Sequence, residues 1–550
     1  MDNYFVSSCK RVKDWICRQF GQKEKKTVHH KKFADGGEVI VWETGRAGEE
    51  AASYENLFLR KEIAGFRTNI RREQSCSIKS LTRDYLYKQL LSSGEYTFDH
   101  MLVIKDPYGE APLTALALFI LEEPACVRVT TKGNLKETDF VTELPKKKEH
   151  RVPILGMYAE KANDIVIEIL DDEGNCVKSH TFTIRTKRLP KSLRNVITVK
   201  KWTDKPAYSN IMINGGVKIH TCVFDIEGEI RYYLSRKPRG YGIFPLSDGH
   251  FFYMEKYISV PSYSNPQTVE SYDMDYFGRV FRTYLTEKGV HHTAEEKAGG
   301  NILTGSNSML EHTEDCVIEI DRQTGEIVWQ LNMAEIFDET YQNMMDWCHV
   351  NSAAYYEKDR TILISLRNVH AVICVDYDTK KLRWILSDPK FWEGTKMTPY
   401  LLQPEGDVKW CYQQHAAFEI ALPDESNPQK KRIIVYDNHW AKRRKAKSFD
   451  KDPLSYVSFY DIDEEKKTVS LHKRFAGPKT RIRANGIYVP DKKRVYNMAG
   501  SYAEPVDGDG GGIFEYDYET GEVLSEFGVK PGFFRAYPFE PNVQELAEPM

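Results

Sequence analysis

An internal repeat in the C-terminal part of the chain constrains the fold more than any other feature of the sequence. From about residue 206 onward, an apolar strand ending in Asp is followed by a polar turn and a second apolar or aromatic strand. The pattern occurs six times, with its aspartates at Asp225, Asp275, Asp321, Asp376, Asp463 and Asp517. Four of the five intervals, 50, 46, 55 and 54 residues, fit a four-stranded propeller blade with its loops. Polar insertions stretch the remaining interval to 87 residues.

Second hairpins lie between the Asp hairpins and predict how the repeat closes on itself. Five are recognisable: GYGIFPLSDGHFFYM, HHTAEEKAGGNILTG, HVNSAAYYEKDRTILISL, HAAFEIALPDESNPQKKRIIVYD and RANGIYVPDKKRVYNMAG. The sixth is expected from two distant segments, residues 208–216 and the C-terminal GFFRAYPFE. Sharing one blade between the two ends of the chain would close a propeller ring. We therefore predict an all-β protein in which residues 200–550 form a six-bladed β-propeller.

Two further regions precede the predicted propeller. Between residues 96 and 192, five to seven short strands alternate with turn signals such as DDEGN, a pattern typical of a small immunoglobulin-like β-sandwich. Residues 1–95 are expected to form a partly helical N-terminal extension of unknown role. It would contain an amphipathic helix over Met1–Phe20 and one or two helices over Glu55–Leu91. For Met1–Phe20, a helix packed on the body of the protein is favoured over a membrane or partner helix.

Composition and charge narrow the class of protein. Of the 550 residues, 41% are hydrophobic and 29% charged, as in soluble globular proteins, and a net charge of −3 favours neither nucleic acid nor an anionic membrane as partner. The ten cysteines are scattered, without a CxxC pair or other metal-type spacing. The N-terminus lacks the features of a secretory signal, and the longest apolar run, PLTALALFIL, is too short to span a bilayer. We therefore expect a reducing, cytoplasmic location and no transmembrane segment.

Three histidines at corresponding places in successive repeats are the strongest functional signal. His292, His349 and His415 each stand near the start of an apolar strand, and Arg367 follows the strand TILISL. Equivalent positions of propeller blades converge on the axis, so these four side chains are expected to meet there. One such histidine alone would more often be a hydrogen-bonded strand-end residue without a catalytic role. Because neighbours on a strand point to opposite faces, only one of His291 and His292 is expected to face the channel.

The motifs around these residues resemble a known enzyme family. DWCHVNSAAYY, SLRN, VICVDYDTKKLRWILSDP and QQHAAF resemble, in that order, the PAPS-independent aryl-sulfate sulfotransferases, a bacterial arylsulfotransferase family. The segment HHT…GGNILTGSN, the closing IFEYDYETGEVLSEF and the stretch from MLVIKDPYG to TFTIRTKRLP resemble the same family. The resemblance implies a six-bladed propeller with an axial active site. It also implies transfer of a sulfuryl group from a phenolic sulfate ester to a phenol, by a ping-pong mechanism through a sulfohistidine.

The same resemblance implies roles for individual residues. His415 of QQHAAF matches the nucleophile, whereas His349 of WCHVNS and Arg367 of SLRN match residues that bind the sulfuryl oxygens. His292, the second histidine of HHT, matches the remaining channel histidine, and Asn351 is expected to support the substrate site. No metal or cofactor is implied, and the expected partners are a small phenolic sulfate donor and a phenol acceptor. Periplasmic members carry a signal sequence and a disulfide, whereas Cys411 has no evident partner here, which favours an intracellular form.

Sulfuryl transfer calls for side chains of these types. By analogy with phosphoryl transfer, the protein must position an in-line nucleophile and neutralise the non-bridging oxygens. A neutral imidazole has a lone pair available for attack near neutral pH, and a guanidinium such as that of Arg367 stays charged throughout. His349 or His292, if protonated, could protonate the leaving phenolate and later take the proton of the acceptor phenol.

Two other classes fit part of the pattern. Three converging histidines are also typical of a zinc site in a metal-dependent hydrolase or lyase, although no pattern of acidic residues that would hydrogen-bond such ligands is recognisable in the sequence. A non-catalytic binding propeller would give no reason for histidines and an arginine that face inward. Aromatic residues near the motifs, among them Trp347, Tyr356 and Tyr436, suit phenolic rings.

Overall fold

Strands dominate the protein, as the sequence predicts. The computed structural model describes residues 28–34, 36–51, 76–203, 205–216, 218–236, 241–258, 267–308, 312–342, 344–422, 427–440 and 452–540. The helix expected over Met1–Phe20 lies outside these residues, whereas part of Glu55–Leu91 falls in α3 (Cys76–Ser92). None of the described helices is both long enough and apolar enough to cross a membrane.

The N-terminal domain is built on one seven-stranded sheet with the order β1-β2-β3-β4-β6-β7, and β5 pairs with β4. Strands β4 and β5 run for 17 and 15 residues, and their register shifts near Ala125. Strands β1 and β2 come from the N-terminal extension, and β2 pairs with β3 in parallel, so the extension adds an edge to this sheet. The strands are β1 (Val28–Lys32), β2 (Glu38–Trp42), β3 (His100–Lys105), β4 (Ala115–Thr131), β5 (Phe140–Ile154), β6 (Ala162–Leu170) and β7 (Cys176–Arg185).

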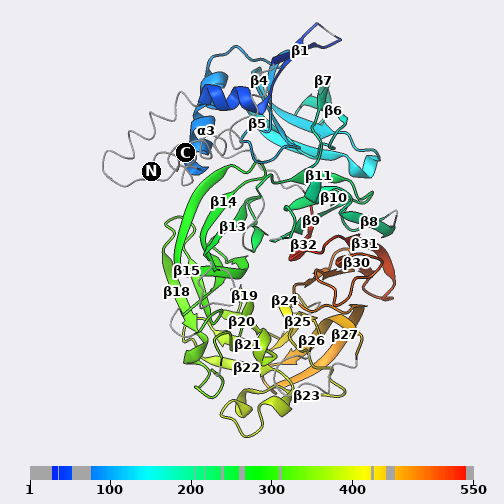
Figure 1. Ribbon diagram of the computed structural model, residues 1–550. Coiled ribbons are helices and arrows are strands. Elements are labelled where there is room, and N and C mark those ends of the chain that lie inside the picture. The colour runs from blue at the N-terminus through cyan, green and yellow to red at the C-terminus, as the bar shows by residue number, and fades with distance from the viewer. Residues whose placement is uncertain are drawn as a thin grey trace, which may run out of the picture.

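The remaining sheets form a propeller-like ring below this domain (Figure 1). The sheet orders are β11-β10-β9-β32, β12 to β18 in sequence, β19 to β22 in sequence, β23-β27-β26-β25-β24 and β28-β29-β30-β31-β8. The first strands are β8 (Ile197–Lys201), β9 (Asn210–Asn214), β10 (Cys222–Asp225), β11 (Ile230–Tyr233), β12 (Gly242–Pro245), β13 (Phe251–Ile258), β14 (Gln267–Met274), β15 (Val280–Glu296), β16 (Ile302–Ser306), β17 (Cys316–Ile320) and β18 (Ile327–Asn332). They are followed by β19 (Val350–Tyr356), β20 (Thr361–Leu366), β21 (Ala371–Asp376), β22 (Leu382–Leu386), β23 (Gln403–Pro404), β24 (His415–Ile420), β25 (Lys430–Asp437), β26 (Leu454–Asp463), β27 (Thr468–Pro478), β28 (Asn485–Val489), β29 (Arg494–Ala499), β30 (Gly511–Asp517), β31 (Val523–Val529) and β32 (Arg535–Phe539).

The repeated aspartates cap the turns of antiparallel hairpins, which explains their recurrence. Asp517 Oδ1, for example, accepts backbone N–H groups from Glu519 and Thr520 at 3.0 and 2.8 Å. Short acidic side chains stabilise such turns by mimicking a backbone acceptor. A side-chain oxygen likewise accepts a hydrogen bond from at least one backbone N–H of the turn at Asp225, Asp275, Asp321, Asp376 and Asp463. The six predicted Asp hairpins are therefore confirmed.

The long strand β15 connects two successive meanders. Its first part pairs with β14 as far as Val290, and from Val290 onward it pairs with β16. One 17-residue strand thus ends one four-stranded meander and begins the next within the seven-stranded sheet.

The ring closes through pairing of distant segments. The C-terminal strand β32 pairs with β9, with Arg535 opposite Asn214, as the sequence predicts for residues 208–216 and GFFRAYPFE. In addition, β8 adds to the outer strand β31 of the last sheet. The C-terminal end of the propeller segment therefore completes the sheet of β9 to β11, and its N-terminal end adds a strand to the sheet of β28 to β31.

A buried arginine joins the N-terminal domain to the ring. Arg231 on β11 donates to the carbonyls of Gly156 and Thr138 at 2.8 and 2.7 Å and to Asp225 at 3.1 Å. Its guanidinium also lies 3.9 Å from the ring centroid of Tyr158. Because the bonds to Gly156 and Thr138 join β11 to segments that flank β5, they hold the N-terminal domain on the first sheet of the propeller.

Candidate active site

The innermost strands of successive sheets bring the predicted histidines together. Strand β15 contacts β19, and β19 contacts β24. His292 lies in β15, His349 directly precedes β19, and His415 is the first residue of β24. All three side chains are buried, and the ring centroids of His292 and His349 are 4.7 Å apart. The backbone N–H of Arg367 donates to the carbonyl of His349 at 3.1 Å, and its Nη2 donates to Gln413, two residues before His415, at 3.1 Å, so Arg367 lies in the same site.

A β-bulge stands at each of the three histidines. The pairing register shifts between His291 and Ala294, between Val350 and Ser352, and between His415 and Phe418. His292 and His349 have φ of 60° and 58°, a conformation that L residues adopt at an energetic cost and often at functional sites. Bulges re-aim side chains next to active sites. These bulges are absent from the sequence pattern and could not be predicted from it.

His415 is held in one tautomer by Asn438. The Nδ1 atom of His415 lies 2.6 Å from Asn438 Oδ1, and Asn438 uses its Nδ2 to donate to Thr480 Oγ1 at 3.0 Å. Nδ1 therefore carries the proton, and Nε2 keeps a lone pair, which accepts a 3.4 Å hydrogen bond from the backbone N–H of Arg483. Burial and the charge of Arg367 lower the pKa of His415 well below its ordinary value. His415 is thus a neutral imidazole with an available Nε2 lone pair at neutral pH.

The two glutamines before His415 fix its backbone. The side-chain amide of Gln414 donates to the carbonyls of Ala371 and Leu366 at 2.7 and 3.2 Å, on the neighbouring sheet. Asn351 donates to the carbonyl of Gln414 at 2.8 Å, so its observed contact holds the segment that leads into His415. Gln413 accepts a hydrogen bond from Arg367 Nη2 at 3.1 Å. This bond links Arg367, which is predicted to bind the sulfuryl oxygens, to the segment before His415.

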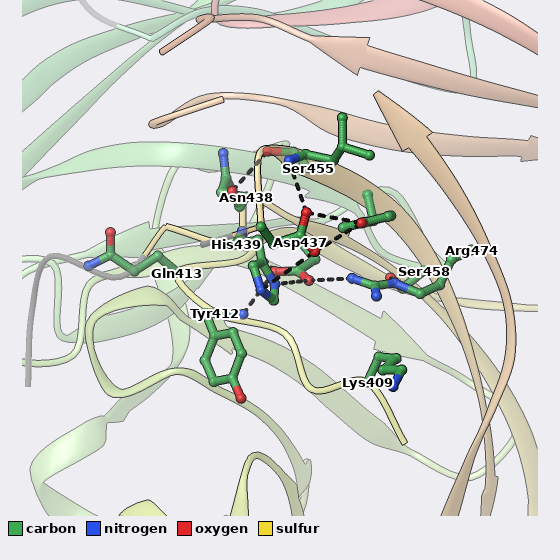
Figure 2. A network of polar contacts seen from close by, with 12 residues as sticks. Lys409, Tyr412, Gln413, Asp437, Asn438, His439, Ser455, Ser458 and Arg474 are labelled. Carbon is green, nitrogen blue, oxygen red and sulfur yellow. Dashed lines mark hydrogen bonds and ion pairs between the residues drawn. The ribbon is translucent and has the colours of Figure 1, made fainter. Parts of the chain in front are cut away.

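A buried carboxylate anchors the loop that carries Asn438. Asp437 accepts hydrogen bonds from the backbone N–H groups of Tyr412 and His439 at 2.9 and 2.8 Å and from Arg474 Nη2 at 3.1 Å. Figure 2 shows this network, with the Asp437 carboxylate between His439 and Arg474. The sequence analysis did not predict that Asn438 is a partner of His415. Its place in YDN, at the end of an apolar strand, is a signal that could have indicated it.

His349 has two carboxylate neighbours, and they set its charge. Its Nδ1 lies 2.6 Å from Glu314 Oε2 and 3.0 Å from Asp346 Oδ2. Burial alone would lower the pKa of His349, but Asp346 and Glu314 outweigh it and raise the pKa to about 9. These two carboxylates were not recognisable in the sequence. Asp346 precedes His349 by only three residues. Glu314 precedes it by 35 residues, so no local sequence pattern predicts the contact of Glu314 with His349.

His291 and His292 do not follow the strand alternation expected of them. Their Nδ1 atoms lie 3.1 Å apart, so both rings point to the same side, because the bulge at His292 breaks the period of two. The Nε2 of His291 donates to the carbonyl of Ser306 at 2.8 Å, which leaves its Nδ1 as an acceptor for the Nδ1–H of His292. The Nε2 of His292 is therefore unprotonated, and burial followed by the charge of His349 lowers the pKa of His292 well below its ordinary value.

The histidines outside this group have structural partners. His370 Nδ1 accepts a hydrogen bond from the backbone N–H of Gln413 at 3.0 Å. His250, which the sequence indicates to be structural, lies 2.6 Å from Asp273 and stacks on Phe281. His370 therefore supports the segment before His415, and His250 supports the fold elsewhere.

Comparison with known proteins identifies the family of the chain. The profile described as "Arylsulfotransferase (ASST)" matches residues 195–535, and "Arylsulfotransferase Ig-like domain" matches residues 102–187. The chain is 22% identical over 563 aligned positions to "Arylsulfate sulfotransferase AssT" of Lelliottia amnigena and 23% identical over 566 to that of Escherichia coli O6:H1 (strain CFT073). Both alignments cover 78% of this chain and 90% of the relative. Since residues 195–535 make up more than half of the 550 residues, the chain belongs to the arylsulfotransferase family.

Proposed function

We propose that this arylsulfotransferase works by a ping-pong mechanism through a sulfohistidine at His415. The observation that carries the proposal is the tautomer of His415, in which Asn438 holds the proton on Nδ1 and Nε2 keeps its lone pair. In the first half-reaction Nε2 attacks the sulfur of the aryl sulfate and forms the N–S bond. The bond from sulfur to the aryl oxygen breaks, and its electron pair goes to the leaving phenolate.

His349 is the proposed general acid of this step. With a pKa raised to about 9 by Asp346 and Glu314, against the opposing effect of burial, it is an imidazolium at neutral pH and can protonate the phenolate through Nε2. In the second half-reaction His349, now neutral, takes the proton of the acceptor phenol. The phenol oxygen then bonds to sulfur, and the N–S electron pair returns to His415. Arg367 neutralises the sulfuryl oxygens, and Asn351 positions the strand of the nucleophile.

His292 is proposed to line the same channel as a neutral imidazole. Its unprotonated Nε2 can accept a hydrogen bond from a substrate hydroxyl, while Nδ1–H is engaged by His291. Its low pKa excludes it as the general acid at neutral pH, which leaves that role to His349.

We further propose that the ring has six blades, with this site on its axis. Six Asp hairpins support that count, because the first strand of each pairs with the strand that precedes it in its sheet. The 17-residue β15 connects two of the blades. The cytoplasmic location also remains a proposal. It is supported by the eight cysteines of the described residues, which are free thiols.

A metal-dependent hydrolase is the second candidate, because His349, Asp346 and Glu314 include three possible ligand atoms close together. Their spacing favours an ion pair between a charged histidine and the two carboxylates instead. Ligand atoms on a tetrahedral zinc with bonds of about 2.0 Å lie about 3.3 Å apart. The separations from His349 Nδ1 to Glu314 and Asp346 are 2.6 and 3.0 Å, which suit an imidazolium between two carboxylates.

Steady-state kinetics with p-nitrophenyl sulfate as donor and phenol as acceptor test the proposal. The mechanism predicts parallel double-reciprocal lines when the donor is varied at several fixed phenol concentrations, and no loss of rate after treatment with a chelator. Intersecting lines would exclude the ping-pong order. Loss of activity with the chelator and recovery with zinc would support the metal-dependent candidate.

A further inference from the structure

Tyr241, which the mechanism above does not use, contacts a carboxylate partner of His349. Its hydroxyl donates to Glu314 Oε1 at 3.2 Å, whereas the other oxygen of that carboxylate, Oε2, lies 2.6 Å from His349 Nδ1. The Glu314 side chain is completely buried. The two oxygens of one buried carboxylate therefore have different partners, a tyrosine hydroxyl and the histidine proposed as the general acid.

The backbone of Tyr241 is anchored by the sheet that closes the ring. Asn214, the last residue of β9, is fully buried, and its Nδ2 atom donates to the carbonyls of Tyr241 and Ile243 at 2.9 and 2.8 Å. Gly242, between these two residues, has a φ of 83°, and a Cβ atom there would collide with Asn214 Oδ1. The local backbone therefore requires glycine at 242 and fixes Tyr241 directly before β12.

The ring of Tyr241 packs between two other rings. Its centroid lies 4.4 Å from that of His292 and 5.4 Å from that of Phe534, with the Phe534 ring edge-on. Such pairs orient an aromatic ring independently of its hydroxyl. Replacement of Tyr241 by phenylalanine would therefore keep the ring in place and remove only the bond to Glu314.

The backbone of Glu314 is fixed as well, which leaves only its carboxylate free to turn. Its N–H donates to Asn307 Oδ1 at 2.8 Å, and its carbonyl accepts the N–H of Val350, the residue after His349, at 2.7 Å. His292 Nδ1, which carries its ring proton, lies 3.7 Å from Glu314 Oε1. A buried carboxylate oxygen that loses a hydrogen bond is costly, so without the hydroxyl the carboxylate would turn toward His292 and away from His349.

We propose that Tyr241 is a positioning residue whose hydroxyl orients the Glu314 carboxylate, so that His349 directs its Nε2 proton at the leaving phenolate. The inference rests on the proposed sulfohistidine mechanism, in which His349 is the general acid. Proton donation matters most when the departing oxygen is strongly basic. Phenyl sulfate releases such an oxygen, whereas p-nitrophenyl sulfate releases a weakly basic one. Loss of the hydroxyl should therefore slow transfer from phenyl sulfate more than transfer from p-nitrophenyl sulfate.

The test measures kcat/KM for these two donors, with 1-naphthol as the acceptor throughout. In a ping-pong reaction this constant reports the first half-reaction and does not depend on the acceptor. In Tyr241→Phe we expect a loss of about tenfold or more with phenyl sulfate and of less than about threefold with p-nitrophenyl sulfate, within the contribution of a general acid. Because both donors are assayed on one preparation, a loss of folded protein cancels from the ratio.

Tyr284→Phe is the matched control. Tyr284 is buried on β15, and its hydroxyl donates to the carbonyl of Arg322 at 2.8 Å, outside the group around His349. The variant removes one buried tyrosine hydroxyl bond and should leave the ratio of the two donors unchanged.

A double-mutant cycle determines whether the hydroxyl acts through Glu314. Glu314→Gln should widen the ratio of the two donors by itself, and adding Tyr241→Phe to it should change that ratio by less than about twofold. Additive effects of the two substitutions would overturn the inference. So would an unchanged ratio in Tyr241→Phe, or an equal loss with both donors.

His349→Gln separates this inference from the mechanism on which it rests. If His349 is the general acid, His349→Gln should widen the ratio at least as much as Tyr241→Phe does. A ratio unchanged in His349→Gln would contradict the proposed general acid and, with it, the role of Tyr241. A ratio that His349→Gln widens and Tyr241→Phe does not would overturn the role of Tyr241 alone.

Discussion

Two histidines of one buried site are held in opposite protonation states by their immediate neighbours. His415 has an amide as partner and a guanidinium nearby, so its neutral form is favoured. His349 has two carboxylates, so its charged form is favoured. Pairs of titratable groups whose pKa values are pushed apart mark the acid and the nucleophile or base of a site. The proposed roles, general acid for His349 and nucleophile for His415, rest on this contrast.

The pH dependence of the donor half-reaction should report these two states. The rate requires neutral His415, whose pKa lies well below its ordinary value, and protonated His349, whose pKa is raised to about 9. We expect kcat/KM for the donor to be flat across neutral pH and to fall as pH rises through about 9. Glu314→Gln removes one carboxylate, so it should move the alkaline limb to lower pH. The exposed Glu326→Gln should leave the limb in place, and an unmoved limb in Glu314→Gln would contradict the role of His349.

Asn438 should control the reactivity of His415 through its tautomer. Asn438→Leu removes the acceptor for Nδ1–H, so a fraction of His415 would carry its proton on Nε2 and could not attack sulfur. Loss of tautomer control costs up to about 10⁴-fold in a hydrolase triad, and we expect a slower nitrophenol burst by 10-fold or more. Asn438→Asp keeps an acceptor but adds a negative charge, so it should raise the pKa of His415 and move the acid limb upward. A burst of wild-type rate in Asn438→Leu would exclude this positioning role.

At the scale of single elements, the sequence predicts the strands but not the irregularities that form the site. Alternation and the repeated aspartates predict the hairpins, because side-chain period and turn chemistry are local properties. The bulges at His292, His349 and His415 depend on pairing with other strands, so they cannot be predicted from the sequence of one segment alone. The same limit explains why the contact of Glu314 with His349, which spans 35 residues of sequence, could not be predicted.

A glycine on β16 should be required for the bulge at His291 and His292. A Cβ atom on Gly305 would lie 2.6 Å from Cε1 and 2.7 Å from Nδ1 of His291, closer than real Cβ contacts. Gly305→Ala should therefore displace the His291 ring and, with it, the hydrogen bond to His292. A misplacement of about 1 Å can cost 10²-fold in rate, so we expect a marked loss of transferase activity with a small change in melting temperature. Full activity in a folded Gly305→Ala variant would show that this contact is not needed.

At the scale of the whole molecule, two pairings between distant segments define the architecture. Strand β32 on β9 and β8 on β31 close the ring, and the first of these could be predicted because the repeat left one hairpin incomplete. The addition of β1 and β2 to the sheet of the N-terminal domain could not, since parallel pairing with β3 leaves no turn signal between partners. The network of Asp437 likewise becomes visible only when β24, β25 and β27 are in place.

The contact between the N-terminal domain and the ring should depend on Arg231. Its side chain is fully buried, so Arg231→Met removes three hydrogen bonds and leaves Asp225 buried without its counter-ion. Removal of one partner of a buried ion pair typically costs about 3–5 kcal/mol, which should appear as a large drop in thermal midpoint. The double variant Arg231→Met/Asp225→Asn also removes the unpaired charge of Asp225, so it should recover part of the lost stability. Equal midpoints for wild type and Arg231→Met would contradict this role.

The intact mass of the protein after a brief reaction with p-nitrophenyl sulfate tests the central claim most directly. Without acceptor, we expect wild-type protein to gain the mass of one sulfuryl group, located on His415 by peptide mapping, and to lose it when phenol is added. His415→Ala should gain nothing, whereas His439→Ala, which changes a histidine outside the proposed reacting group, should still be sulfated. A wild-type protein that transfers sulfate to phenol without any covalent gain, or a gain that persists in His415→Ala, would contradict the account.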